Sequence, residues 1–298
     1  MPPVEDTASA RQARPAVRRR ARYDGHVLDQ ATQAAIGRAA AMLLRSRHTV
    51  VLAGAGMSKE SGIPTFRGEG GLWTTQGEPP INQYETFAAD PKRWWERRLA
   101  DARAGNAFGA AIENAQPNAG HRALAELEDM GRVAHVISQN IDDLHRRAGQ
   151  RSLTEIHGNR LWVRCVRCGA RWPREEFPVD EAGLPPRCAA PGCPGVVKSD
   201  TVMFGEPIPP LALARCEAET ARADCFMTVG TSAVVYPAAA YPIEAARRGV
   251  PLIEVNPEET PLTPLAEIVV RAASGEALPA LVAAVRERQV APHGEGTR

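Results

Sequence analysis

Short apolar runs alternate with amphipathic stretches along most of the chain. In residues 31–45 the apolar positions recur at helical spacing, and residues 48–53 (HTVVLA) then form a β-branched run that leads into a glycine. The same order recurs three times, with strands at 134–138, 225–229 and 251–255 after helices at 122–129, 211–221 and 239–248. Continuous apolar strands between amphipathic helices are typical of a parallel sheet that is covered on both faces. The pattern therefore predicts an α/β fold.

Three of the predicted strands run directly into polar or glycine-containing loops. The loops begin at Gly54 (GAG), Gln139 (QNID) and Gly230 (GTS). Because open parallel sheets bind ligands at the carboxyl ends of their strands, we expect these loops to share one crevice. The prediction is thus a Rossmann-like parallel sheet with helices on both faces and a ligand site where the strands end.

Two segments interrupt the alternation. Residues 160–198 contain four cysteines, several prolines and little periodicity, so we expect a small inserted zinc-ribbon or helical module that is held by metal instead of a core. Residues 68–116 contain a Gly-rich loop and then a helical stretch, which predicts a cofactor loop and a helical cap over the crevice. The predicted α/β domain then consists of residues 26–159 and 199–286.

The two ends of the chain differ from this domain in composition. Residues 1–25 are rich in Pro, Ala and Arg and carry almost no large apolar side chain, which predicts a disordered basic tail. Its arginines could contact nucleic acid or an acidic partner, but a solvated tail is the favoured interpretation. Residues 287–298 are predicted to be a flexible C-terminus.

Composition narrows the class of protein. The 298 residues suit one large domain or two small ones, and 36 Lys plus Arg against 35 Asp plus Glu leave a net charge of +1. A near-neutral total argues against a protein that binds nucleic acid or membranes over its whole surface. No apolar run is long enough to span a bilayer, and no apolar stretch follows the N-terminal arginines, so we expect a cytoplasmic protein. Arginine and alanine are abundant but lysine is scarce, which suggests a GC-rich genome.

Four of the six cysteines have the spacing of a metal site. Cys165 and Cys168 are separated by two residues, and Cys188 and Cys193 by four. Two thiolate pairs at such spacing fit one tetrahedral zinc ion with no open coordination position. We therefore expect one structural zinc that holds the insertion together and does not activate water. Cys216 and Cys225 lie outside the cluster and are interpreted as packing residues.

The segment GAGMSKESGIPTFRG at 54–68 resembles a phosphate-binding turn. A strand that runs into Gly-Ala-Gly lets the backbone approach a diphosphate closely and offers its N–H groups. The segment departs from the hydride-transfer fingerprint because Lys59 stands where its third glycine belongs. A lone Gly-x-Gly can also be a tight turn and nothing more. The polar groups that follow, Ser58, Ser61 and Arg67, favour the phosphate interpretation.

Two further segments carry polar chemistry. Gln139, Asn140 and Asp142 follow a predicted strand, and although Asp142 alone could be a helix cap, three polar side chains exceed what a cap requires. His157 stands before a glycine, where the chain crosses back towards the crevice, and a neutral imidazole can act as a general base near pH 7. Taken alone, Asp142 or His157 could also be structural.

Three more segments complete the set. Residues 201–206 (TVMFGE) are predicted to be extended and could pair with another extended chain. Residues 230–232 (GTS) and 256–258 (NPE) follow the last two predicted strands. Each of them could also be a strand followed by a simple turn.

The order of these segments resembles the sirtuin family of NAD-dependent protein lysine deacylases. The shared motifs are GAG-x-S-x-x-SGIP-x-FR, QNID, HGN, the two cysteine pairs, FGE and GTS, over about residues 28–285. The resemblance implies a deacylase, most simply a deacetylase, that uses NAD as cosubstrate and acts on acyl-lysine proteins or peptides. It implies neither a membrane nor a nucleic-acid partner.

The resemblance also implies roles for individual residues. The NAD diphosphate and neighbouring ribose are expected at Gly54, Ala55, Gly56, Ser58, Thr65, Phe66 and Arg67. The nicotinamide pocket is expected at Gln139, Asn140, Ile141 and Asp142, and the adenosine half at Gly230, Thr231, Ser232, Asn256, Pro257, Glu258 and Ala273. The residues implied in catalysis are His157 as general base, Asn140 and Asp142. The substrate peptide is expected to pair with Val202, Phe204 and Gly205.

The implied reaction is acyl transfer and not hydride transfer. The acyl oxygen of the modified lysine attacks C1′ of the nicotinamide ribose and nicotinamide leaves; His157 then helps the 2′-hydroxyl to attack. Water, positioned with help from Asn140, completes transfer to 2′-O-acyl-ADP-ribose and free lysine. The alternatives are an NAD-dependent ADP-ribosyltransferase or NAD hydrolase, which breaks the same glycosidic bond, and a noncatalytic NAD-sensing zinc module.

The chain departs from the family pattern at three places. Members that remove acidic acyl groups carry a Tyr and an Arg three apart in one helix, whereas Arg98 and Asp101 align with those positions here, which predicts a preference for acetyl or other neutral acyl groups over succinyl. Thr65 stands where an Asp is often found. The second cysteine pair has four intervening residues where two are common, which changes a turn but not the number of ligands.

Overall fold

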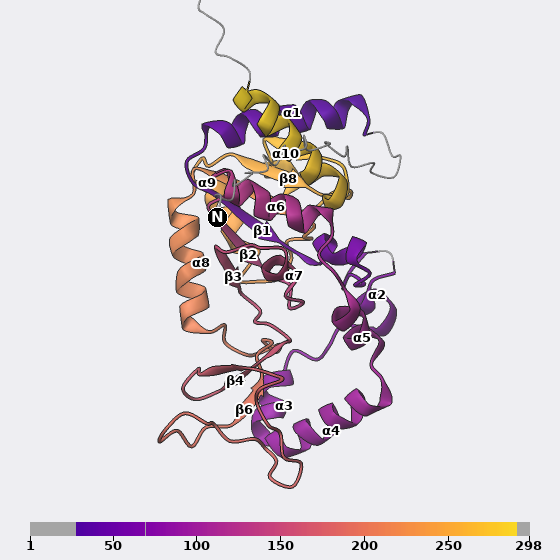
Figure 1. The fold of residues 1–298 in the computed structure, drawn as a ribbon, viewed down its shortest axis with the longest axis vertical. Coiled ribbons are helices and arrows are strands. Elements are labelled where there is room, and N and C mark those ends of the chain that lie inside the picture. The colour runs from indigo at the N-terminus through magenta and orange to yellow at the C-terminus, as the bar shows by residue number, and fades with distance from the viewer. Residues whose placement is uncertain (1–27, 69, 291–298) are drawn as a thin grey trace, which may run out of the picture.

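The computed structural model describes residues 28–68 and 70–290, which form a larger part around a six-stranded sheet and a smaller part around a three-stranded sheet (Figure 1). The predicted tail at 1–25 lies outside the described residues, as do residues 291–298 of the predicted C-terminus. The other predicted elements fall within the described part, where each can be compared with the structure.

The large sheet is entirely parallel and confirms the predicted fold class. Its strands lie in the order β3-β2-β1-β7-β8-β9. From β1 the sheet thus grows to one side through β2 and β3, and to the other side through β7, β8 and β9. The strands are β1 (Thr49–Ala53), β2 (His135–Ser138), β3 (Leu153–Glu155), β7 (Cys225–Val229), β8 (Leu252–Val255) and β9 (Ile268–Val270). Four of them match the predicted strands, whereas β3 and β9 are three-residue edge strands that the apolar pattern misses.

Helices cover both faces of this sheet, as the continuous apolar strands predict. Alternate residues of β1 point to opposite faces: Val51 and Ala53 belong to one buried apolar cluster, and Val50 and Leu52 to another. The first cluster includes the helices α1 (Gln30–Arg45), α6 (Ala119–Asp129) and α10 (Ser274–Val290). The second includes α8 (Pro210–Arg222) and α9 (Ala240–Arg247).

The last helix continues beyond the predicted end of the domain. Residue 286 is the predicted boundary, but α10 runs to Val290. Its residues Leu278, Leu281, Val282 and Val285 are buried against α1 and α6, whereas residues 286–290 are exposed. The last turn therefore extends a packed helix through residues that favour helix by themselves, since Arg, Glu and Gln all have high helix propensity.

The smaller part joins the cysteine segment to the predicted cap. Its antiparallel sheet has the order β5-β4-β6, formed by β4 (Trp162–Cys165), β5 (Arg171–Pro173) and β6 (Val197–Ser199). The cap comprises α2 (Leu72–Gln76), α3 (Gln83–Ala89), α4 (Pro91–Ala104) and α5 (Ala107–Asn114). Helices α3 and α4 lie beside β4 and β6 (Figure 1), and the buried Trp95 Nε1 donates a hydrogen bond of 2.8 Å to Val197 O. The cap is thus anchored on the cysteine module.

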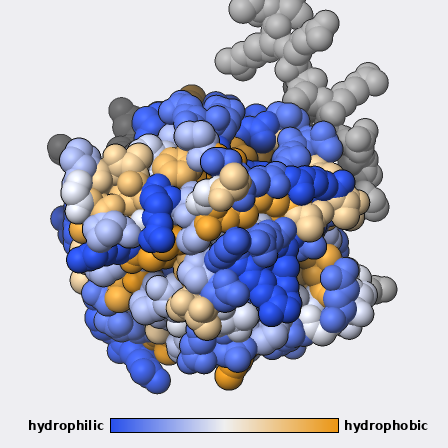
Figure 2. Space-filling model, turned by 90° about the horizontal axis from the view of Figure 1, so that it is seen from below, coloured by the Kyte–Doolittle hydropathy of each residue, from blue (hydrophilic) through white to orange (hydrophobic). Residues whose placement is uncertain are grey.

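The surface around this smaller part shows no continuous apolar face. Seen from that end, hydrophobic residues lie in small groups between hydrophilic ones (Figure 2). Large exposed apolar patches mark interaction sites, and this view gives no sign of one. Among the described residues no helix is both long and apolar enough to span a bilayer.

Two buried histidines behind the large sheet should make folding sensitive to acid. His121 on α6 and His145 on the short helix α7 (Leu144–Arg147) lie with ring centroids 4.9 Å apart. Burial lowers the pKa of His121 to about 2 and that of His145 to about 4. On mild acidification both imidazoles therefore stay neutral in the folded protein. In the unfolded chain the same histidines already bind protons.

We expect the free energy of unfolding to fall as the pH drops below about 6.5, the unfolded histidine pKa. His145 contributes its stability fully above this pH, and between pH 6.5 and 4 about 3 kcal/mol of that contribution should be lost. Urea unfolding at several pH values tests this for the native chain and for His145→Leu. The variant should show a shallower pH dependence; equal slopes would contradict the prediction.

Candidate active site at the carboxyl ends of the central strands

A crevice of about 1230 Å³ lies where the central strands of the large sheet end. The loops that follow β1, β2, β7 and β8 all line it, so the structure brings together the GAG, QNID, GTS and NPE segments. The predicted site residues that line the crevice are Gly54, Ala55, Gly56, Thr65, Phe66, Arg67, Gln139, Asn140, Ile141, His157, Val202, Phe204, Gly205, Gly230, Thr231, Ser232, Asn256, Pro257, Glu258 and Ala273. Ser58 and Asp142 are not among them.

Ser58 and Asp142 lie behind the crevice wall. Ser58 Oγ donates a 2.6 Å hydrogen bond to Asp142 Oδ2 and accepts one of 3.1 Å from Asn140 Nδ2. Asp142 Oδ1 accepts from the Leu144 backbone N–H, but the N-cap residue of α7 is Asp143, so Asp142 is not the helix cap of the alternative interpretation. Burial raises the pKa of Asp142. Ser58 therefore contacts the Asn140 amide directly, whereas Asp142 is linked to it through Ser58.

The two glycines of the GAG turn are needed for close packing against the loop after β7. Gly54 N–H donates to Val229 O at 3.0 Å, and Gly56 N–H donates to Gly230 O at 2.8 Å. A Cβ on Gly56 would lie 2.8 Å from Gly230 O, which leaves no room for a side chain. The N–H groups of both glycines thus donate to protein carbonyls, because the hydrogen-bond ladder between β1 and β7 continues into their loops.

His157 presents one free ring nitrogen to the crevice. Its Nδ1 lies 3.0 Å from Gln139 O, and because a carbonyl only accepts, Nδ1 carries the proton. Nε2 is then left as an acceptor. Burial lowers the pKa of His157, and the hydrogen bond to Gln139 opposes this shift. The imidazole is therefore neutral at pH 7, the state that a general base needs.

Only glycine fits at position 158, in the turn that follows His157. Gly158 has a φ of +74°, and a Cβ there would lie 2.1 Å from Asp200 O. Val202 N–H donates to His157 O at 2.8 Å, so segment 201–205 begins directly beside the histidine. The prediction that residues 201–206 are extended is wrong for the second half of the segment, because Glu206 N–H donates to Met203 O at 3.0 Å and closes a turn over Phe204 and Gly205.

An aromatic group that the sequence analysis missed lies over the same side of the crevice. Phe66 packs against Trp73 with ring centroids 4.8 Å apart, and Trp73 packs against Phe204 at 5.5 Å. The Arg67 guanidinium lies 4.5 Å from the Trp73 ring centroid and pairs with Glu78 Oε1 at 2.8 Å. Trp73 comes from the cap. The apolar periodicity of the sequence does not indicate that this side chain contacts the crevice.

The loops on the β7 and β8 side hold one another through polar side chains. Gln139 Nε2 donates to Thr231 Oγ1 at 2.8 Å, and Asn256 Nδ2 donates to Thr231 O at 3.1 Å. Thr231 thereby joins the loops after three different strands. The arrangement gives this side of the crevice a rigid polar wall.

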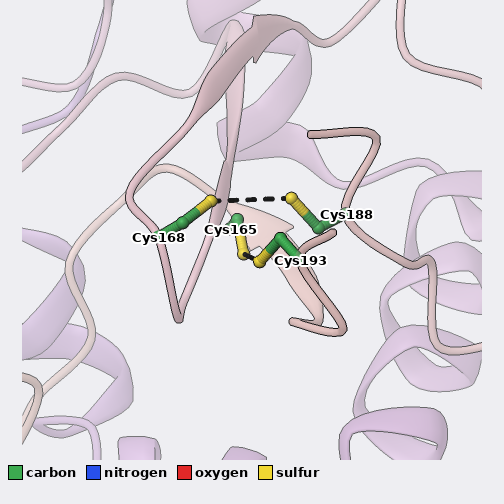
Figure 3. A group of neighbouring side chains, drawn as sticks. All are labelled: Cys165, Cys168, Cys188 and Cys193. Carbon is green, nitrogen blue, oxygen red and sulfur yellow. Dashed lines mark hydrogen bonds between the residues drawn. The ribbon is translucent and has the colours of Figure 1, made fainter. Parts of the chain in front are cut away.

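The four clustered cysteines fit one tetrahedral zinc ion (Figure 3). A Zn–S bond of about 2.3 Å requires neighbouring sulfurs about 3.8 Å apart. The Sγ atoms of Cys165 and Cys193 are 3.7 Å apart, those of Cys168 and Cys188 are 3.6 Å apart, and all four lie within 4.8 Å of one another. Four thiolates complete the coordination, so the ion holds the module together. Cys216 and Cys225 are buried elsewhere, as the sequence analysis expects.

Comparison with known proteins agrees with this geometry. The family model described as the Sir2 family matches residues 54–237. An NAD-dependent protein deacylase of Thermococcus kodakarensis is 44% identical over 257 residues, which cover 85% of this chain and 96% of that protein. The solved structure of a Sir2 homologue in complex with NAD is 40% identical, with a TM-score of 0.69, and covers 84% of this chain and 94% of its own.

A further solved structure holds a peptide. It is a Sir2 protein with a deacetylated p53 peptide and 3′-O-acetyl-ADP-ribose, 32% identical, with a TM-score of 0.68 over 83% of this chain and 97% of its own. The family model spans more than half of the chain, and the relatives match nearly their whole lengths. The chain therefore belongs to the Sir2 family, the sirtuins.

Proposed function

We propose that this protein is an NAD-dependent protein lysine deacylase that transfers the acyl group from lysine to ADP-ribose and releases nicotinamide. The observation that carries the proposal is the position of His157. His157 lines the crevice with Nε2 left as an acceptor, while its own carbonyl holds segment 201–205, beside which a substrate peptide can lie. A base beside both a dinucleotide crevice and a peptide-binding edge suits acyl transfer between the two.

The residues of the crevice fit NAD. Glycine at 54 and 56 keeps the loop flat against β7, and the cavity is larger than the roughly 300–1,000 Å³ of most ligand pockets, so it can hold a dinucleotide and an acyl-lysine together. Thr65, Phe66 and Arg67 would hold the diphosphate and ribose, Gln139, Asn140 and Ile141 the nicotinamide, and the residues at 230–232, 256–258 and Ala273 the adenosine half. When bound, NAD supplies the ADP-ribose acceptor and the nicotinamide leaving group.

The chain's own groups then have defined tasks. Acyl-lysine, NAD and water give lysine, O-acyl-ADP-ribose and nicotinamide. His157 Nε2 accepts the proton of the ribose hydroxyl that attacks the acyl group, and the Asn140 amide, held by Ser58 and Gly54 O, orients the water. Asp142 is a positioning residue that acts through Ser58. Val202, Phe204 and Gly205 present the acyl-lysine.

The main alternative is transfer of ADP-ribose to protein, or plain hydrolysis of NAD. Hydrolysis of NAD needs no protein segment beside the histidine, and transfer of ADP-ribose to protein needs no general base for a ribose hydroxyl. The hydrogen bond from Val202 N–H to His157 O therefore favours deacylation.

The acyl group that we expect the enzyme to prefer is acetyl. Arg98 lines the crevice but is already engaged: it donates to Ser199 Oγ at 3.3 Å and lies 5.3 Å from the centroid of the Trp94 ring. A succinyl carboxylate would have to displace these contacts without help from a neighbouring tyrosine, and Asp101 is exposed away from the crevice lining. Peptides with acetyl-lysine should therefore give a kcat/KM about tenfold higher than peptides with succinyl-lysine.

One assay tests both the function and the preference. The purified protein is incubated with NAD and a panel of acyl-lysine peptides, and nicotinamide release is measured together with product mass. O-acyl-ADP-ribose in equal amount to nicotinamide supports deacylation. Bare ADP-ribose or ADP-ribosylated protein without an acyl product contradicts it. Faster removal of succinyl would leave the deacylase intact and overturn only the preference.

A further inference from the structure

A buried ion-pair network connects the zinc module to both ends of the segment 201–205. We propose that Arg164 is a positioning residue that fixes this segment for peptide binding. The inference rests on the proposed function, because it concerns how the acyl-lysine peptide is held. It assigns a task to a residue that lies outside the crevice lining.

Arg164 contacts the two carboxylates that flank the segment. The residue is buried on β4, its Nη2 lies 2.7 Å from Glu206 Oε1, and its Nε lies 3.3 Å from Asp200 Oδ1. Asp200 directly precedes Thr201, and Glu206 directly follows Gly205. One planar guanidinium therefore spans the distance between the two ends of the peptide-binding segment.

Each carboxylate is fixed to the surrounding backbone as well. Asp200 Oδ2 accepts from the Asn159 backbone N–H at 3.0 Å, in the turn that carries His157. Glu206 Oε2 accepts from the Met203 backbone N–H at 2.9 Å, in the middle of the segment, and pairs with Lys198 Nζ at 2.9 Å. The network thus sets the segment relative to His157 as well as to the zinc module.

The zinc site fixes the strand that carries Arg164. The next residue is the zinc ligand Cys165, and β4 pairs with β6 so that Arg164 lies opposite Lys198 and Cys165 opposite Val197. The strand that carries the guanidinium is therefore fixed by thiolate ligands at its end. Figure 1 shows β4 and β6 below the large sheet, next to α3.

The loops expected to hold the diphosphate and adenosine have no contact with Arg164 within the described residues. The residues at 54–56, 230–232 and 256–258 follow strands of the large sheet, and the ion pairs of Arg164 reach only Asp200 and Glu206. Removing the guanidinium leaves Asp200 paired with Arg171 and Glu206 paired with Lys198 but breaks the link between the two carboxylates, so the ends of segment 201–205 should shift. The effect should fall on peptide binding and spare NAD binding.

The test compares three full-length variants with the native enzyme: Arg164→Met, Arg164→Lys and the control Arg187→Met. Arg187 is an exposed arginine of the same module, and no ion pair of its side chain occurs within the described residues. KM is measured separately for an acetyl-lysine peptide and for NAD, and zinc content is measured for each protein.

We expect Arg164→Met to raise the peptide KM by about tenfold or more, with the NAD KM changed by less than about twofold and one zinc retained. Arg164→Lys should give a smaller rise, because an ammonium keeps the charge but cannot bridge both carboxylates. If Arg164→Met does not fold, the lysine variant carries the test. An unchanged peptide KM, an equal rise in both KM values, or loss of zinc would overturn the inference. Failure of the native enzyme to release nicotinamide with any peptide would instead contradict the proposed function.

Discussion

His157→Ala is expected to lower kcat for deacylation by about 10²–10⁴-fold, the usual contribution of a general base. The variant removes the imidazole whose Nε2 is free, but leaves the crevice loops and their mutual hydrogen bonds in place. Steady-state kinetics with an acetyl-lysine peptide and NAD measure the loss. Thermal stabilisation by NAD should persist, since the chain's other cofactor residues are unchanged.

His157→Gln separates the proton transfer from the structural contact. Glutamine can still donate to Gln139 O but cannot act as a base near pH 7. It should be as slow as the alanine variant, whereas near-native activity would show that only the contact matters. In the native enzyme the lowered pKa of His157 predicts that activity persists at neutral pH and declines on acidification, once the imidazole binds a proton.

Loss of zinc is expected to unfold the segment between β4 and β6 and to abolish deacylation. Structural zinc supplies about 10–16 kcal/mol of folding free energy in small zinc domains, as much as the total stability of many proteins. The module's own apolar cluster is small, with Val163, Phe177 and Val197 at its centre. Cys165→Ala, or treatment with a chelator, should therefore remove the near-UV circular dichroism of Trp162 and Trp172.

The control for the zinc-ligand variant is Cys216→Ala. Cys216 lies on α8, in an apolar cluster away from the metal site. It should lose some stability through the cavity it creates, but keep one zinc per chain and its activity. Replacement of zinc by cadmium should also preserve activity, because a site with four thiolates leaves no position for a reacting water. Full activity after complete zinc removal would contradict the structural role.

The apolar pattern predicts the strands at the centre of the sheet but not those at its edges. β1, β2, β7 and β8 are continuous apolar runs because both faces are buried, and such runs are visible in the sequence. β3 (LTE) has no such run, and its pairing with β2 depends on the tertiary position of the chain. β3 therefore needs the fold before it can be recognised, whereas β9 (IVV) is an apolar run too short to stand out.

The candidate site was predictable as a set of loops and less so as a set of contacts. Parallel topology brings Gly54, Gln139 and Gly230 to one crevice, which follows from where their strands end. The position of Asp142 behind Asn140 depends on side-chain direction, which residue spacing does not determine. Arg164 has no motif at all, because its partners become neighbours only when β4 is folded beside segment 201–205.

The pairing of β1 with β7 has a consequence for how the protein is made. The GAG turn follows the first strand of the sheet, but the carbonyls that accept from Gly54 and Gly56 belong to Val229 and Gly230, which come after the entire zinc module in the chain. On the ribosome β1 can pair with β2 early, while its other edge stays open until β7 has been synthesised. Nascent chains of this enzyme thus carry an unprotected central strand during much of translation, and this is the stage at which a chaperone would contribute most.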